Sequence, residues 1–467
     1  MKRLFGTNGI RFILGEDLNV DDIVRIGMAV GTFFKGGKCL LGRDIRKTGE
    51  VVAQAITSGL MATGCNVYDI GLITTPALQF TVKAQGFDFG IMITASHNPP
   101  EYNGIKVIDH DGVEIERSKE ERIEDIYFHE KFTLSNWRSV GRHYYCNNEG
   151  IIEEYIKAVI KHIDADVVKG KKFTVVIDPA NSVGILTTPR LAKILNCRVL
   201  TINGNLDGDF PGREPEPRPD NLEGLATAVV SSGADFGVAH DGDGDRAIFV
   251  DEKGNIHWGD RSGALIVEYY LREHPGETVV TPVSSSVVIE EVARRHGGRV
   301  VYTKVGSIHV SRKMLELKAP LGVEENGGVF FGPHHPVRDG TMTTALILNI
   351  LAKEENPLSK LMARLPKYYQ MKLRVPCPNE LKENVLKVLR EATKDMKVDH
   401  TDGVKIWYDR RSWVLIRPSG TEPIFRIYAE ADDKSKLNNI VNKAKSMLED
   451  AIDEVTKKDR FNTPRTK

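Results

Sequence analysis

A serine-containing loop follows an apolar run of strand length. The run FDFGIMI spans residues 87–93, and the polar loop TASHNPPEYNGIK follows it at 94–106, with Ser96 near its start. Pro99 and Pro100 push the residues before them out of the helical region, so we expect a stiff loop that holds Ser96 in one place. Because α/β proteins place reactive groups at strand ends, Ser96 is a candidate nucleophile. An ordinary Ser/Asn/Pro turn is the alternative for this motif alone.

Three aspartates alternate with glycines in DGDGDR, residues 241–246. The glycines free the backbone to curl, so the carboxylates of Asp241, Asp243 and Asp245 can converge on Mg²⁺, a hard cation that leaves room for water and a phosphate. An EF-hand is not favoured, because its sixth position needs glycine and here is Arg246. A dinucleotide loop is not favoured either, since the carboxylates would repel a pyrophosphate. A solvated acidic turn is the remaining alternative.

Two arginines bracket a polar turn in RPSGTEPIFR, residues 417–426. The glycine permits a tight loop whose backbone N–H groups point inward, and hydroxyl and guanidinium groups complete a site for a phosphate. A surface turn with incidental arginines is the alternative. The candidate phosphate-binding residues are Arg417, Ser419, Gly420, Thr421 and Arg426.

Other reaction classes fit these motifs less well. The segment GTFFKGGKC (31–39) has the wrong glycine-to-lysine spacing for a Walker A loop, so ATP hydrolysis is not expected. His97 adjoins Ser96, but neighbouring side chains on an extended loop tend to point apart, and no G-x-S-x-G elbow is present, so a hydrolase triad is not expected. A serine, a Mg²⁺ loop and a phosphate pocket together indicate phosphoryl transfer.

The composition describes a globular protein without a global charge excess. Of its 467 residues, 41% are hydrophobic and 27% charged, and Lys+Arg and Asp+Glu both number 64. The absence of a basic excess argues against nucleic acid as a partner and favours anionic small molecules bound by local clusters. The five cysteines show no CxxC spacing, which argues against a zinc site or a disulfide framework and fits a reduced cytoplasm. No apolar run is long enough to span a membrane.

Alternating strands and helices must position these loops. The segments GFDFGIM (86–92) and GADFGVA (233–239) share the frame G-x-D-F-G, which indicates an internal repeat, and a third α/β unit delivers Glu324 at the end of its last strand. We therefore predict an α/β protein in which three similar doubly wound α/β domains and a smaller C-terminal α+β domain surround one central cleft. The predicted domains span residues 1–150, 151–254, 255–368 and 369–467.

Together these motifs resemble the α-D-phosphohexomutase family, which includes phosphoglucomutase, phosphomannomutase and phosphoglucosamine mutase. FGTNGIR, TASHNPPEYNGIK, DGDGDR, VEENGG and RPSGTEPIFR are similar to its signature loops, in the right order and over almost the whole chain. The resemblance implies an isomerase in which a phosphoserine phosphorylates a hexose 6-phosphate and the 1,6-bisphosphate then returns its other phosphate to the serine. It also implies Mg²⁺ as cofactor, a hexose 1,6-bisphosphate as intermediate and activator, and a monomer or homodimer.

The resemblance assigns roles to residues of this sequence. Ser96 would be the phosphoserine and would hold Mg²⁺ together with the three aspartates. Arg11 and Lys304 are the candidates for general base or acid, although each of them, like Arg46, is more typical of a solvated surface charge when taken alone. The remaining active-site positions are His97, Lys106 and Arg246, with Glu324 and Asn326 contacting sugar hydroxyls and the RPSGTEPIFR loop binding the non-reacting phosphate.

Some positions depart from the commoner patterns of the family. Phe12 and Val323 stand where glycine is frequent, Asn326 replaces a serine, and Gly328 stands where many relatives carry a histidine. EENGG and the FGTNGIR start are most similar to the archaeal phosphoglucosamine mutase branch, with phosphomannomutase/phosphoglucomutase next, so we expect glucosamine phosphate as the substrate. A sugar-phosphate binding protein without catalytic activity and a Mg²⁺-dependent phosphatase are the alternatives from other classes.

Overall fold

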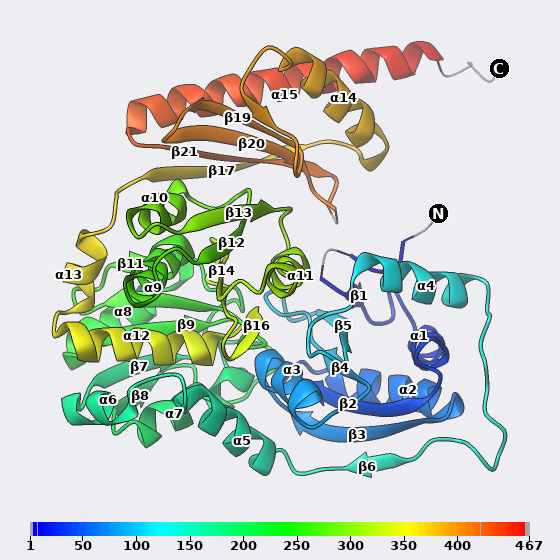
Figure 1. Cartoon of the computed structure of the whole chain (residues 1–467). Helices are drawn as coiled ribbons and strands as arrows, with labels where there is room; N and C mark the ends of the chain where they lie inside the picture. The colour runs from blue at the N-terminus through cyan, green and yellow to red at the C-terminus, as the bar shows by residue number, and fades with distance from the viewer. Residues whose placement is uncertain (1–2, 7, 421, 463–467) are drawn as a thin grey trace.

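The strands that the structure describes form four separate sheets along the chain. The structure is a computed structural model that describes residues 3–6, 8–420 and 422–462. We number the domains I to IV by these sheets, which follow one another from the N-terminus to the C-terminus. Domains I to III lie together, and domain IV lies above them in Figure 1. Among the helices of the described residues, none combines the length and the apolar character that a bilayer crossing requires.

Domain I contains a six-stranded sheet in the order β1-β5-β4-β2-β3-β6. Strand β4 is buried at all five positions because helices cover both faces of the sheet, which explains its unbroken apolar sequence. The elements of this domain are β1 (Ile10–Ile13), α1 (Val20–Phe34), β2 (Gly37–Arg43), α2 (Gly49–Ala62), β3 (Cys65–Leu72), α3 (Thr75–Ala84), β4 (Phe89–Ile93), β5 (Tyr102–Asp109), α4 (Arg117–Phe128) and β6 (His143–Tyr145).

Domains II and III each contain a five-stranded sheet, in the orders β11-β10-β9-β7-β8 and β13-β12-β14-β15-β16. The elements of domain II are α5 (Glu149–Ile160), α6 (Ala165–Lys171), β7 (Thr174–Asp178), α7 (Thr188–Ile194), β8 (Arg198–Thr201), α8 (Glu223–Ser232), β9 (Phe236–His240), β10 (Ala247–Asp251) and β11 (Ile256–His257). Those of domain III are α9 (Gly259–Glu273), β12 (Thr278–Pro282), α10 (Val287–Arg295), β13 (Arg299–Thr303), α11 (Ser307–Leu317), β14 (Leu321–Val323), β15 (Val329–Phe331), β16 (His335–Arg338), α12 (Gly340–Glu354) and α13 (Leu358–Ala363).

Four strands of each of the three sheets share one order, which supports the internal repeat predicted from the sequence. In each domain, two parallel strands are followed by a third that is parallel to the first, as in β2, β3 and β4. The chain then returns antiparallel, through β5, β10 or β15. The sheets are therefore mixed, whereas a doubly wound sheet built from βαβ units alone would be parallel. The candidate functional loops are the connections that precede the three returning strands.

Domain IV is a five-stranded antiparallel sheet in the order β17-β21-β20-β19-β18. Its helices cover the upper face in Figure 1, so the other face is turned toward domains I to III. Its core is separate from the large core that joins domains I, II and III. The elements are β17 (Tyr369–Pro376), α14 (Lys382–Ala392), β18 (Val398–Asp399), β19 (Val404–Asp409), β20 (Ser412–Pro418), β21 (Ile424–Ala431) and α15 (Lys434–Asn462).

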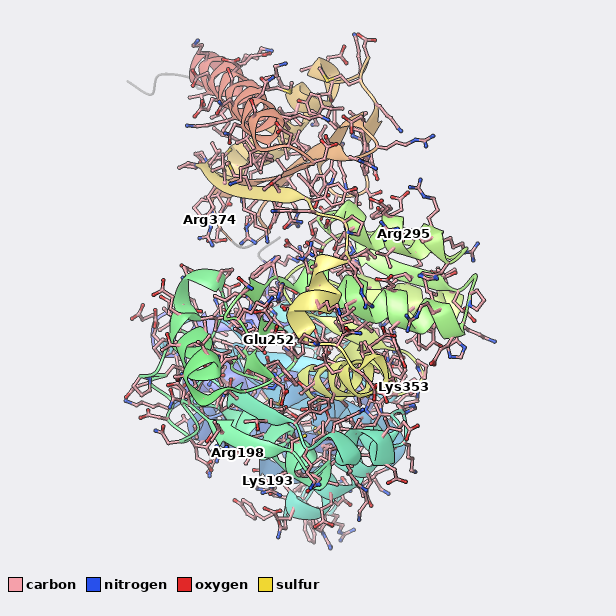
Figure 2. The ribbon with its side chains drawn as sticks, turned by 90° about the vertical axis from the view of Figure 1, so that its left-hand side faces the viewer. Lys193, Arg198, Glu252, Arg295, Lys353 and Arg374 are labelled. Carbon is pink, nitrogen blue, oxygen red and sulfur yellow. The ribbon has the colours of Figure 1, made fainter. Side chains whose placement is uncertain are left out.

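Domain IV contacts domain III through a small apolar cluster and through buried polar groups. Figure 2 shows domain IV above the other domains, with Arg374 on its lower face and Arg295 on the domain beneath. The Glu430 carboxylate of β21 accepts hydrogen bonds from the backbone N–H of Val287 (2.9 Å) and from the amide of Gln370 (2.9 Å). That amide also donates to the Asp260 carboxylate at the start of α9 (2.8 Å). Asp260 is therefore a second carboxylate at this junction, and it is 2% exposed.

Asp260 provides a test of this junction through pH. Burial, together with the nearby Glu325 carboxylate, raises the pKa of Asp260 to about 7. The folded protein thus binds a proton more tightly than the unfolded chain does, so this group lowers stability as the pH rises from about 4 to 7. The free energy of unfolding of Asp260→Asn, compared with that of the unmodified protein, should therefore rise by about 2 kcal/mol from pH 5 to pH 8. Denaturant unfolding at several pH values measures the difference, and a difference that does not change with pH would contradict this prediction.

Candidate active site

The Ser96 side chain lies in a strained, buried turn directly after β4. Its backbone has a positive φ of 50°, and the residue is 1% exposed. The Oγ atom donates a hydrogen bond to the Asp241 carboxylate of domain II (2.8 Å) and lies 3.5 Å from Nδ1 of His97. The expectation that Ser96 and His97 point apart is wrong, because the left-handed backbone at Ser96 replaces the extended conformation on which it was based. The loop of residues 94–101, the serine loop, thus holds both side chains together.

Arg46 fixes the shape of the serine loop. Its guanidinium donates to the carbonyl oxygens of Ser96 (2.9 Å), Asn98 (2.6 Å), Pro99 (2.5 Å) and Tyr102 (2.7 Å). The side chain is fully buried and also donates from Nε to Asp44 (3.1 Å). The prediction of a solvated surface charge is therefore wrong for Arg46. A planar group with five donors can satisfy several carbonyl groups at once, which the sequence motif GRDIRKT did not reveal.

We expect Arg46→Lys to destabilise the protein by about 3 kcal/mol, because a lysine cannot bond to four carbonyl groups and Asp44 together. Turnover should fall as well, since the turn that presents Ser96 loses its support. Arg43→Lys is the matched control: Arg43 pairs with Glu50 at the surface (2.6 Å), so its replacement should cost less than about 1 kcal/mol. Denaturant unfolding of both variants measures the difference, and equal losses would contradict this role of Arg46.

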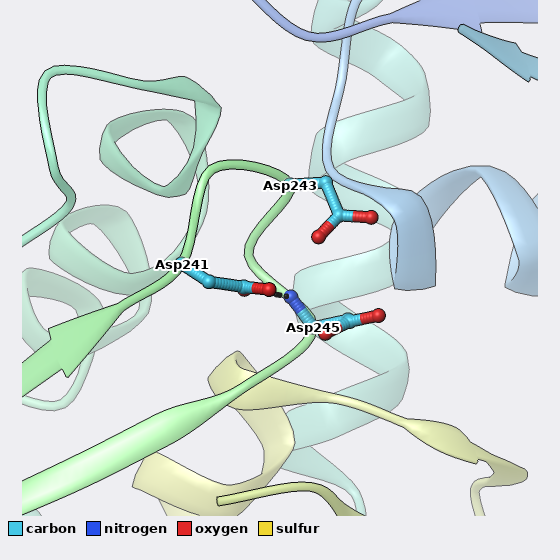
Figure 3. Close-up of side chains that lie close together, drawn as sticks. All are labelled: Asp241, Asp243 and Asp245. Atoms are coloured by element: carbon cyan, nitrogen blue, oxygen red, sulfur yellow. Dashed lines mark hydrogen bonds between the residues drawn. The ribbon is translucent and has the colours of Figure 1, made fainter. Parts of the chain in front are cut away.

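The three aspartates converge on one point from the loop between β9 and β10, residues 241–246, the aspartate loop. Figure 3 shows the side chains of Asp241, Asp243 and Asp245, with a hydrogen bond of 3.1 Å from the Asp245 N–H to the Asp241 carboxylate. Each residue offers a carboxylate oxygen, and these oxygens lie within 4.8 Å of one another. Gly242 allows the approach of the serine loop, because a Cβ at this position would lie 2.4 Å from the Ser96 carbonyl oxygen.

Lys106 of β5 partly neutralises this acidic cluster. Its Nζ atom is fully buried and lies 2.8 Å from Asp243 and 3.5 Å from Asp245. Although burial opposes its charge, the surrounding carboxylates, Asp243 first, raise the pKa of Lys106, so it stays an ammonium group. Burial also opposes ionisation of Asp243, but the same contact lowers the pKa of that carboxyl. Asp241 differs, because burial and the other two aspartates raise its pKa.

The aspartates could hold a divalent cation. Oδ1 of Asp243 and Oδ1 of Asp245 are buried without a hydrogen-bond partner among the described residues. Buried carboxylate oxygens normally have partners, and a hard cation such as Mg²⁺ prefers such oxygens. Both the donor set and the unpaired oxygens therefore fit a magnesium ion.

Arginines from other elements surround the serine. Arg11 of β1 donates to the Thr94 carbonyl oxygen, and burial lowers the pKa of Arg11 to about 10, which leaves it charged at neutral pH. Arg246 donates to Nδ1 of His97 (3.0 Å). Burial and the Arg246 and Arg11 guanidinium groups lower the pKa of His97 well below its usual range, so the ring is neutral. The side chains near Ser96 thus combine fixed positive charge with one neutral imidazole.

Glu324 is connected to the aspartates by Arg338, a residue that the sequence analysis did not identify. It follows β14 in the loop of residues 324–328, the glutamate loop, and is 3% exposed. Arg338 of β16 lies 2.6 Å from Asp245 and 3.4 Å from Glu324. A Cβ at Gly328 would lie 2.6 Å from Cδ of Arg338, so this arginine occupies the space beside the loop. The Asn326 side chain accepts a hydrogen bond from the Gly328 N–H (3.3 Å) and so closes the turn.

The arginine loop, residues 417–426, connects β20 and β21 of domain IV. Arg417 and Arg426 are direct partners in the register of these strands, and Arg426 is also the partner of Arg374 on β17. Three arginines thus stand in a row across three adjacent strands, on one face of the sheet. Like charges in this position repel one another, so the row is suited to an anion. Arg374 lies outside the RPSGTEPIFR motif, and only the strand register shows its place.

Carboxylates already contact all three arginines, and Arg374 lies 3.5 Å from Glu422. Arg417 Nε lies 3.0 Å from Asp402, and Arg426 pairs with Glu422. The Ser419 hydroxyl accepts a hydrogen bond from the Glu422 N–H (3.2 Å). Gly420 is exposed in the same loop, and Thr421 lies outside the described residues.

Lys304 lies on the domain III side of the same junction. It is exposed, and its neighbour Val305 donates its N–H to Asp402 of domain IV (3.0 Å). Of the predicted site residues that the structure describes, one connected cluster is formed by Arg11, Ser96, His97, Lys106, Asp241, Asp243, Asp245, Arg246 and Glu324. Lys304 lies outside this cluster, next to Val305, whose partner Asp402 also pairs with Arg417.

Comparison with known proteins identifies the family. Models of four phosphoglucomutase/phosphomannomutase domains match the chain: alpha/beta/alpha domain I at residues 2–134, domain II at 153–254, domain III at 258–369 and the C-terminal domain at 373–445. Together they cover most of the sequence. The chain belongs to the phosphohexomutase family, enzymes that transfer a phosphoryl group within a sugar phosphate.

The sequences of individual relatives match this chain along almost their whole length. The chain is 45% identical to a phosphoglucosamine/phosphogalactosamine mutase of Sulfurisphaera tokodaii, with 96% of this chain and 100% of the relative covered. It is 42% identical to a phosphoglucomutase/phosphomannomutase of Thermococcus kodakarensis, with 97% and 100% covered. A phosphoglucomutase/phosphomannomutase family protein of Burkholderia thailandensis has a similar structure, with a TM-score of 0.84, 28% identity and coverage of 96% and 97%. The predicted family, fold class and enzyme class are confirmed.

Proposed function

We propose that this mutase interconverts glucosamine 6-phosphate and glucosamine 1-phosphate through a phosphoserine at position 96. The observation that carries the mechanism is the contact between Ser96 Oγ and Asp241 (2.8 Å), which joins the candidate nucleophile to the candidate metal site. The sugar assignment rests on EENGG and on the S. tokodaii relative, which is named for glucosamine and galactosamine phosphates.

The phosphoryl group moves in two balanced steps. The O1 hydroxyl of the 6-phosphate attacks the phosphorus of phosphoserine 96, the Ser96 Oγ–P bond breaks, and the hydroxyl proton leaves with a base. The resulting 1,6-bisphosphate reorients in the site so that its 6-phosphoryl group faces Ser96. Ser96 Oγ then takes the 6-phosphoryl group, the O6–P bond breaks, and a proton returns to O6. Arg11, Lys106 and Arg246 supply fixed positive charge near the transferred group, which stabilises its transition state.

Mg²⁺ bound by Asp241, Asp243, Asp245 and the serine phosphate would neutralise charge on the transferred group. The Asp241 carboxylate orients Ser96 Oγ by the hydrogen bond described above. Because Lys106 keeps its proton, it is unsuited to act as a base. Arg11 and Lys304 stay the candidates for proton transfer, and burial, which lowers the pKa of Arg11 to about 10, makes this guanidinium a better base than an arginine in water.

Sugar and distal phosphate would bind between two domains. Glu324 and Asn326 would contact neighbouring ring hydroxyls, and a carboxylate that bonds to two hydroxyls can serve either orientation of the bisphosphate. Arg417, Ser419, Gly420, Thr421 and Arg426 would bind the non-reacting phosphate, and the register of the strands adds Arg374 to this set. Phosphate would replace the Asp402 and Glu422 carboxylates as the partner of these arginines.

A coupled assay tests the proposal directly. The purified protein is incubated with Mg²⁺, a trace of glucose 1,6-bisphosphate and either glucosamine 6-phosphate, mannose 6-phosphate or glucose 6-phosphate, and the 1-phosphate product is measured. We expect the largest kcat/KM with the glucosamine ester. Fast turnover of mannose or glucose phosphate without detectable turnover of glucosamine phosphate would overturn the sugar assignment in favour of a phosphomannomutase/phosphoglucomutase. Release of inorganic phosphate would indicate a phosphatase instead.

The organisation of the molecule completes the proposal. We propose domain boundaries near residues 150, 254 and 368, a cytoplasmic location, and a monomer or homodimer. Phosphorylation of Ser96 by a hexose 1,6-bisphosphate would start the catalytic cycle. Gel filtration with light scattering tests the oligomeric state, and limited proteolysis tests the boundaries.

A further inference from the structure

The glutamate loop and the arginine loop belong to different domains. The first lies in domain III and the second in domain IV, and a substrate with a sugar ring at one end and a phosphate at the other must reach both. The distance between the loops therefore decides whether both ends of the substrate bind at once. Domain IV has a core of its own, and a small apolar cluster, formed by Val283 and Val287 with Trp413, Leu415 and Tyr428, joins it to domain III. Contacts across this junction, polar pairs as well as this cluster, therefore set the distance.

Lys372 of β17 makes such a contact at the glutamate loop. Its ammonium group pairs with the Glu325 carboxylate, which lies between the two candidate sugar-binding residues in the sequence. The same ammonium group lies 4.8 Å from the centre of the Trp258 ring and 5.5 Å from that of Tyr428. Trp258 immediately precedes α9 of domain III, whereas Tyr428 belongs to β21 of domain IV. The lysine is therefore held by groups of both domains.

The two ends of this contact are fixed to the two loops. Glu325 stands on a tightly packed backbone, because a Cβ at Gly259 would lie 2.6 Å from the Glu325 carbonyl oxygen. On the other side, Lys372 is the strand partner of Tyr428, and Arg374, two residues further on the same face of β17, is the partner of Arg426. A shift of Lys372 relative to Glu325 thus shifts the row of arginines by the same amount.

We propose that the Lys372–Glu325 ion pair is a positioning contact that sets the distance between the sugar-binding and phosphate-binding loops and so selects substrates of hexose phosphate length. This inference rests on the roles proposed above for the two loops. In this proposal, neither Lys372 nor Glu325 touches the substrate. The pair acts through Glu324 and Asn326 on one side and through Arg374 and Arg426 on the other.

The test compares a ligand that reaches both loops with one that reaches a single loop. Titration calorimetry without Mg²⁺ measures the affinity of Lys372→Met, Glu325→Gln and the double variant for glucosamine 6-phosphate and for inorganic phosphate. Each single variant should bind glucosamine 6-phosphate about fivefold more weakly and keep its affinity for inorganic phosphate, and the double variant should lose little more. The charge-reversed pair Lys372→Glu with Glu325→Lys should recover part of the loss.

Lys434→Met is the matched control. This exposed lysine lies 5.4 Å from the centre of the Tyr369 ring, which packs against the core of domain IV on the face of β17 opposite to Lys372, so both affinities should stay unchanged. An equal loss of inorganic phosphate binding in Lys372→Met would show that Lys372 supports the phosphate site itself and would overturn the proposal, as would fully additive losses in the double variant. These binding measurements need no turnover. Absence of mutase activity in the unmodified protein would therefore refute the proposed function separately.

Discussion

Ser96→Ala should lower kcat by a factor of about 10⁴ or more, because the variant has no oxygen that can carry the phosphoryl group between the two positions of the sugar. The unmodified protein incubated with glucose 1,6-bisphosphate and Mg²⁺ should gain the mass of one phosphate, and peptide mapping should place it on Ser96. Added hexose monophosphate should remove it. Because Ser96 lies in a turn fixed by Arg46, we expect no large change in stability from the loss of its hydroxyl group.

The matched control is Ser231→Ala in α8, which removes an exposed hydroxyl from a helix of domain II. It should keep full activity and the same phosphorylation. An unphosphorylated Ser96 under all these conditions, with sugar phosphates still bound, would contradict the mutase cycle and favour a binding protein. Substantial activity in Ser96→Ala would show that another group carries the phosphoryl group.

Asp243→Asn should lower kcat by about 10³-fold or more, since it removes a metal ligand and leaves the buried Lys106 with weaker compensation. A chelator should abolish the activity of the unmodified protein, and added Mg²⁺ should restore it. A second measurement does not depend on activity. Three buried carboxylates within 4.8 Å repel one another, so Mg²⁺ should raise the melting temperature of the unmodified protein and have a much smaller effect on the variant.

Asp209→Asn is the control for this charge change. Asp209 pairs with Lys47 at the surface (2.6 Å), so its neutralisation should leave both kcat and the response to Mg²⁺ unchanged. A normal Mg²⁺ response in Asp243→Asn would show that the cation binds elsewhere. Full activity of the unmodified protein in the presence of a chelator would contradict the metal site.

The parts of the site that the sequence predicted are those encoded by short segments. Ser96 and the three aspartates follow apolar strands directly, and their loops contain the glycines and prolines that shape them. Arg338 and Arg374 could not be predicted in this way. Arg338 reaches Asp245 from a different domain, and Arg374 joins Arg426 only through the register of β17 and β21. Both positions follow from pairings between distant segments, and no local pattern encodes these.

The fold, too, was predictable where short segments encode it and not where distant segments pair. The alternation of strands and helices predicted three α/β units, because periodicity and turn residues are local signals. The antiparallel return of β5, β10 and β15 was missed, since each of these strands reads as an apolar segment whose direction is set only by its partner. The positive φ at Ser96 was missed for a related reason. A serine does not favour this conformation, and the carbonyl groups bonded to Arg46 enforce it.

The common strand order in domains I, II and III is the arrangement that duplication of one unit would produce. One ancestral unit, copied twice, would supply three pairs of strands whose connecting loops, here called tips, could diverge. One tip would then have acquired a serine, another three aspartates and the third a glutamate. A tip between two paired strands can change in length and composition while the hydrogen bonds of the sheet stay intact. New substrate preferences in this lineage are thus expected to arise by mutation of the tips, with the strands beneath them conserved in pattern.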